Sequence, residues 1–89
     1  MIVIISMESA PKSLIGIVSQ YFIQVDRSLF VSQTTVRVVD LMIKIISENI
    51  GDGRAVIMTS NNSPLGLSIT EIRLNNISPY NCNLSDIIS

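Results

Sequence analysis

The sequence predicts a small α+β domain, and three observations lead to this fold class. The chain has 89 residues, which is enough for one compact domain and too few for two. Its apolar residues form short β-branched runs in some segments and recur every three to four positions in others. Segments with these two patterns alternate along the chain, and we therefore expect strands and helices to alternate as well.

The first strand is predicted at residues 2–7 (IVIISM), an apolar run without polar alternation that is typical of a central strand covered on both faces. Ser9 and Pro11 then offer an N-cap and a first-turn proline. From Leu14 to Val25, apolar residues recur at helical spacing. This stretch is predicted to be the first helix.

The middle of the chain predicts a short strand and a second helix. Residues 28–32 (SLFVS) are β-like, and the sequence leaves open whether they follow a hairpin or belong to one bent strand. Thr34 or Thr35 can cap the helix that follows, and residues 51–53 (GDG) can end it. The apolar face of this helix is expected to consist of Val39, Met42, Ile43, Ile46 and Ile50.

The last third predicts further strands. Residues 54–59 (RAVIMT) form a clear strand, and residues 61–64 (NNSP) form a turn cluster. In the next strand, the apolar phase changes between Ile69 and Ile72, which predicts a bulge near Thr70 or Glu71. We divide the chain into a core with its following strand (1–79) and a polar C-terminal arm (80–89).

This order of elements, β-α-β-β-α-β with extra C-terminal strands, is the pattern of a ferredoxin-like sheet with two helices on one face. The chain offers no third helix for the other face. Hydrophobic residues make up 47% of the chain and charged residues only 15%. We therefore expect two copies to stack sheet to sheet as a homodimer, because each buried Ile or Val contributes roughly 1.5–3 kcal/mol.

Composition limits the chemistry. Histidine is absent and Cys82 is the single cysteine, which excludes an intrachain disulfide, histidine-activated nucleophiles and multi-thiolate zinc sites. The seven carboxylates suit a hard cation such as Mg²⁺. A net charge of −1 gives no support for strong independent nucleic-acid binding. We expect a cytoplasmic protein without membrane contact, because no apolar run is long enough to span a bilayer and no signal peptide is recognisable.

Glu8 is the candidate for a functional residue. It lies where the first strand ends and the first helix is about to begin, which is where α/β sheets tend to place ligands. Two copies of Glu8 across a dimer axis could share one Mg²⁺. The alternative is that Glu8 only interacts with the positive end of the helix. Lys12 and Arg37 mark the two helix starts, where a phosphate could bind or where a solvated side chain would be ordinary.

Three stretches carry a resemblance to a known family. They are the spacing E-x-x-P-x-x-L-x-G from Glu8 to Gly16, then LFVSQTTVRVVDLM, then AVIMTSNNSPLGLSITEIRLNNISP. In their order and spacing, from Ile2 to about Pro79, they resemble the CRISPR-associated protein 2 family in its subtype I-E form.

The resemblance implies a ferredoxin-like homodimer that bridges two dimers of the integrase, CRISPR-associated protein 1. That assembly captures a short double-stranded DNA, the protospacer, and inserts it into the CRISPR array. The chain would then be a non-catalytic scaffold. Other branches of the family are described as magnesium-dependent endonucleases that act through an acidic residue at the end of strand 1. Glu8 occupies that position, so a nuclease acting on RNA or DNA, with Glu8 as catalytic and metal-binding residue, is the alternative.

The sequence departs from the family pattern at its basic residues. Ser13 and Ile15 stand where the family has arginines that contact phosphates, and Asn76 and Ile77 replace a later arginine pair. The nucleic-acid contacts that remain are expected at Lys12, Arg37, Arg73 and Asn75. DNA affinity should therefore depend largely on the integrase subunits. A third hypothesis is a structural or small-molecule-sensing module.

Overall fold

A computed structural model describes residues 1–60 and 66–83, with side chains described up to residue 79. The predicted turn at residues 61–64 lies outside these ranges. The elements follow in the order β1 (Ile2–Glu8), α1 (Lys12–Val18), β2 (Ile23–Asp26), β3 (Leu29–Gln33), α2 (Val36–Asn49), β4 (Arg54–Ser60), β5 (Gly66–Arg73) and β6 (Asn76–Asn83). Among the described residues, no helix is long and apolar enough to cross a membrane.

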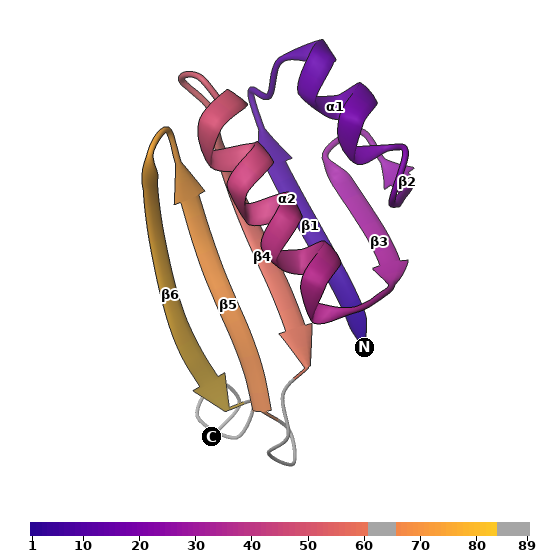
Figure 1. Cartoon of the computed structure of the whole chain (residues 1–89), viewed down its shortest axis with the longest axis vertical. Coiled ribbons are helices and arrows are strands. Elements are labelled where there is room, and N and C mark those ends of the chain that lie inside the picture. The colour runs from indigo at the N-terminus through magenta and orange to yellow at the C-terminus, as the bar shows by residue number, and fades with distance from the viewer. Residues whose placement is uncertain (61–65, 84–89) are drawn as a thin grey trace.

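The strands form one six-stranded sheet in the order β2-β3-β1-β4-β5-β6, and every neighbouring pair is antiparallel. Both helices lie on the same face of this sheet (Figure 1). The first four strands and the two helices have the ferredoxin-like order, which confirms the predicted fold class. β5 and β6 extend the sheet beyond β4, and β6 runs through to Asn83; residues 84–89 of the expected arm lie outside the described part.

The core fills the space between the sheet and the helices. Alternate residues of β1 are buried on the helix-facing side of the sheet. Of the predicted apolar face of the second helix, Val39, Met42, Ile46 and Ile50 are buried, and Ile43 is half-buried. The completely enclosed side chains come from both layers: Val3, Ile5, Leu14, Val18, Phe30, Met42, Ile46, Ile50, Ala55 and Ile72. α2 ends where predicted, because Gly51 has φ 62° and can adopt the left-handed conformation without strain.

The prediction of a helix as far as Val25 was wrong. α1 ends at Val18, and hydrogen bonds of tight turns carry the chain to Phe22, which is buried in the core. Residues 23–26 form β2, and β2 and β3 make the hairpin that the sequence left open. The apolar spacing continued because Phe22 packs in the core, while Ile23 and Val25 are β-branched and favour a strand.

The predicted bulge near Thr70 or Glu71 was also wrong. The β4–β5 register runs from Ala55↔Ile72 to Ser60↔Leu67 without a shift. The apolar phase changes because β5 has apolar residues on both faces. The register shift instead lies in β2, between Gln24 and Asp26.

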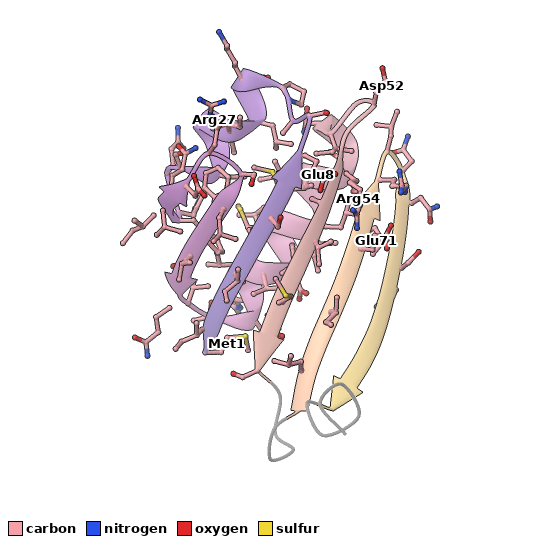
Figure 2. The ribbon with its side chains drawn as sticks, turned by 180° about the vertical axis from the view of Figure 1, so that it is seen from behind. Met1, Glu8, Arg27, Asp52, Arg54 and Glu71 are labelled. Carbon is pink, nitrogen blue, oxygen red and sulfur yellow. The ribbon has the colours of Figure 1, made fainter. Side chains whose placement is uncertain are left out.

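We call the side of the sheet opposite the helices the open face. Residues paired by register share a face, so the pairs Ile23↔Val31, Val31↔Ile4, Ile4↔Met58 and Met58↔Ile69 form one line across five strands. We call these five side chains the apolar row. In the part of the protomer that the structure describes, no helix covers them, as both helices lie behind the sheet in Figure 2.

Candidate functional site

Glu8 is the last residue of β1, next to the start of α1, as the sequence predicted. Val3, Ile5 and Met7 point into the core, so Glu8 projects from the open face, away from the helices. Its side chain is 66% exposed, and its Oε1 lies 3.8 Å from Nη1 of Arg54. The interaction partner of Glu8 is therefore a guanidinium group on β4, which sequence reasoning did not identify.

The loops around Glu8 explain why Arg54 lies beside it. Glu8 and Arg54 are paired by the β1–β4 register. Gly53, just before Arg54, comes so close to β1 that a Cβ there would overlap the carbonyl oxygens of Glu8 and Ser9. Ser9 has a φ of 57°, a left-handed conformation that turns the chain away from β1. Ser9 is therefore not the N-cap that the sequence predicted; that position is taken by Pro11.

Two further charges extend this site across β5. Nε of Arg54 lies 3.9 Å from Oε1 of Glu71, and Nε of Arg73 lies 3.5 Å from the same oxygen. Figure 2 shows Glu8, Arg54 and Glu71 side by side on β1, β4 and β5. We call Glu8, Arg54, Glu71 and Arg73 the charged rim, because they lie at one end of the open face. Ion pairs near the surface contribute only about 0–1 kcal/mol each to the free energy of unfolding. The charged rim therefore matters for what it can bind more than for the stability of the fold.

The four predicted nucleic-acid contacts do not form one patch on the protomer. Lys12 is the first residue of α1 and lies at the same end of the sheet as Glu8. Arg37 is in the first turn of α2, which begins at the opposite end, near the N-terminus (Figure 1). Arg73 is held by Glu71 on the open face. The basic side chains are therefore dispersed over both ends and both layers.

Asn75 has a structural role in the turn between β5 and β6. Its φ is 54°, a conformation that asparagine tolerates better than most residues. Its backbone N–H donates to the carbonyl oxygen of Ser47 at 2.9 Å, which ties the turn to the end of α2. The positive φ accounts for asparagine at this position, and its contact with nucleic acid stays a prediction.

A family model described as CRISPR-associated protein (Cas_Cas2CT1978) matches residues 1–83. The chain belongs to this family. The match covers both helices and all six strands, so the assignment applies to the whole described domain. It confirms a CRISPR-associated protein related to the family that the motifs resemble. A comparison with curated proteins gave no match.

For this member of the Cas_Cas2CT1978 family, the residues around Glu8 can be tested against a magnesium site. Mg²⁺ requires near-octahedral oxygen ligands and is usually bound through carboxylates and water. In the ranges 1–60 and 66–83, no group of three or more Asp, Glu, His or Cys could hold a metal. Arg54 instead places a positive charge beside Glu8. On one protomer, the described residues around Glu8 therefore do not fit this ion, and sharing of Mg²⁺ by two Glu8 carboxylates in a dimer stays a prediction.

A cleft of about 370 Å³ lies beside the site, between the end of β1, α1 and the β2–β3 turn. Met7, Ile15 and Phe30 provide apolar walls, and Glu8 and Arg27 also line it. Its volume is at the lower end of the range of roughly 300–1,000 Å³ for ligand pockets. This cleft is where the small-molecule hypothesis would have to be tested.

Proposed function

We propose that this chain is a non-catalytic scaffold subunit of the CRISPR spacer-acquisition complex, in the manner of subtype I-E. It acts as a homodimer that bridges two dimers of the integrase, CRISPR-associated protein 1, and helps to hold the protospacer duplex. Membership in the Cas_Cas2CT1978 family supports the CRISPR-related part of this proposal. The surface of the sheet supports the dimer.

The apolar row carries the proposal. It places five apolar side chains in one line across the sheet, and Ile23 at its end is 73% exposed. Burying apolar surface stabilises an interface by roughly 25 cal/mol per Å². A second copy of the chain offers the same apolar row on a face of equal size. Stacking of two such faces would remove both rows from water.

A two-fold dimer suits a bridging role. Its two ends are equivalent, so it can bind two identical partners and fix the distance between them. It also doubles the number of basic side chains, which brings a second Lys12 and a second Arg37 to the assembly. Such side chains position a duplex through its phosphates without recognising its sequence. Strand transfer belongs to the integrase in this proposal.

Co-purification with the CRISPR-associated protein 1 integrase of the same organism tests this function. We expect a stable complex that contains two copies of the chain between two integrase dimers and that binds a short DNA duplex. Spacer insertion by the complex should require both proteins. Absence of association at low and moderate salt, or equal insertion by the integrase alone, would contradict the proposal.

A further inference from the structure

We propose that Arg54 is the built-in cation of the site at the end of β1. Its guanidinium takes the place beside Glu8 that a divalent metal ion would otherwise occupy. This role of Arg54 depends only on the residues of the charged rim, and not on whether the chain bridges integrase dimers.

The position of Arg54 between two carboxylates is the first reason. β4 lies between β1 and β5 in the sheet, and the side chain of Arg54 is on the same face as those of Glu8 and Glu71. Nη1 lies 3.8 Å from Glu8 and Nε lies 3.9 Å from Glu71. One guanidinium therefore lies within ion-pair distance of carboxylates from both neighbouring strands.

The fixed position of this side chain is the second reason. Nε of Arg54 is buried, and within the described residues it has no hydrogen-bond partner. Only 38% of the side chain is exposed, compared with 57% for Arg73. Gly53 and the β1–β4 register hold the backbone of Arg54 against the end of β1. The fold therefore holds the positive charge of Arg54 at the end of β1.

The consequence for metal binding follows from electrostatics. A divalent cation bound to Glu8 would lie close to the guanidinium of Arg54, because Nη1 of Arg54 is only 3.8 Å from Oε1 of Glu8. Two positive charges so close together repel each other. Within the described residues, removal of the guanidinium charge of Arg54 leaves Glu8 without a cation beside it, whereas Glu71 keeps Arg73, whose Nε lies 3.5 Å from its Oε1. Mg²⁺ and Mn²⁺ can bind through a single carboxylate and complete their coordination with water.

Titration with Mn²⁺ tests the proposal on the full chain. Mn²⁺ broadens the NMR signals of nearby backbone amides, so its binding at Glu8 is seen without any activity assay. The wild-type chain should show no broadening centred on Glu8 and Glu71 up to about 1 mM Mn²⁺. A dissociation constant of about 1 mM corresponds to a binding free energy of about −4 kcal/mol, so any site of the wild type must be weaker than this. Arg54→Gln should acquire broadening centred on the amide of Glu8, with at least tenfold higher affinity than the wild type. Arg54→Lys, which keeps the charge, should behave like the wild type.

The dependence on Glu8 completes the test. In the double variant Glu8→Gln/Arg54→Gln, the acquired broadening should be lost or weakened at least fivefold. Broadening at Glu8 in the wild-type chain would overturn the proposal, and so would an Arg54→Gln chain that folds and gains no Mn²⁺ binding. Should Arg54→Gln fail to fold, the wild-type titration and Arg54→Lys still decide, because Glu8-centred binding in either contradicts a built-in cation.

Discussion

At the residue scale, Gly53 sets the distance between the α2–β4 loop and the end of β1. A Cβ at this position would overlap backbone oxygens of Glu8 and Ser9, which cannot move aside as a flexible side chain could. We expect Gly53→Ala to lower the free energy of unfolding by about 1–3 kcal/mol, the usual cost of overpacking. Urea denaturation followed by circular dichroism measures this change.

Gly16 provides the matched control. It lies within α1, and a Cβ there would meet nothing within 4 Å. Gly16→Ala should therefore leave stability unchanged or raise it by up to about 1 kcal/mol, since alanine is the better helix former. Equal losses in the two variants would mean that the close approach at Gly53 is not what holds the loop.

Arg37 and Arg73 should contribute differently to duplex binding. Within the described part of the chain, Arg37 forms no ion pair, whereas Arg73 is bound to Glu71. Each phosphate contact accounts for a slope of about 0.9 in a plot of log K against log salt concentration. We expect Arg37→Gln to lower duplex affinity of the integrase complex and to reduce this slope by about 1–2, because a dimer loses two contacts.

The Arg73→Gln variant is the comparison for this measurement. Its effect should be smaller, because a phosphate must first displace Glu71 from Arg73. Fluorescence anisotropy at several salt concentrations gives both slopes. A larger loss for Arg73→Gln than for Arg37→Gln would show that the open face, rather than the start of α2, contacts the duplex.

At the element scale, the β5–β6 turn depends on the backbone conformation of Asn75. Its φ of 54° is costly for β-branched residues and free for glycine. Asn75→Val should therefore destabilise the protein by about 1–2 kcal/mol. Asn75→Gly should keep the turn and its hydrogen bond to Ser47. The two variants are compared by thermal unfolding, and equal melting temperatures would contradict a conformational role.

The sequence predicted those elements whose apolar pattern is consistent with either a strand or a helix, but not with both. β1, β4 and α2 were located well, because a continuous β-branched run and a long 3.6-residue period have no competing interpretation. α1 and β2 were merged, because Phe22 and Val25 continue a helical spacing by coincidence. β5 was given a false bulge, because Leu67 and Ile69 lie on the open face while Ile72 lies in the core.

The candidate site was only half predictable for a related reason. Glu8 could be located from its place at the end of a strand. Its partner Arg54 and the second carboxylate that Arg54 contacts, Glu71, lie about 46 and 63 positions further along the chain, and only the strand order brings the three together. Local sequence patterns carry no information about this register. The pairing that decides what Glu8 can bind was therefore visible only in the folded chain.

At the scale of the whole molecule, the two faces of the sheet differ in their cover. Helices α1 and α2 cover one face and complete the core (Figure 1). The open face has a charged rim at one end and the apolar row across its middle. A protomer of 89 residues gains limited stability from a single core, so burial of the second face should also stabilise the fold.

Met58 lies within the apolar row, between Ile4 and Ile69, and is the residue with which to test the dimer. A carboxylate at this position would be buried without a partner in a stacked dimer, at a cost of several kcal/mol. Leu41→Glu is the control, because Leu41 is 40% exposed on α2, away from the open face. Both variants should keep the circular dichroism spectrum of the wild type.

Sedimentation equilibrium at micromolar concentration tests the dimer most directly. We predict twice the protomer mass for the wild type and for Leu41→Glu, and the protomer mass for Met58→Glu. A folded wild-type chain that sediments as a single protomer would contradict the stacked dimer and, with it, the bridging role.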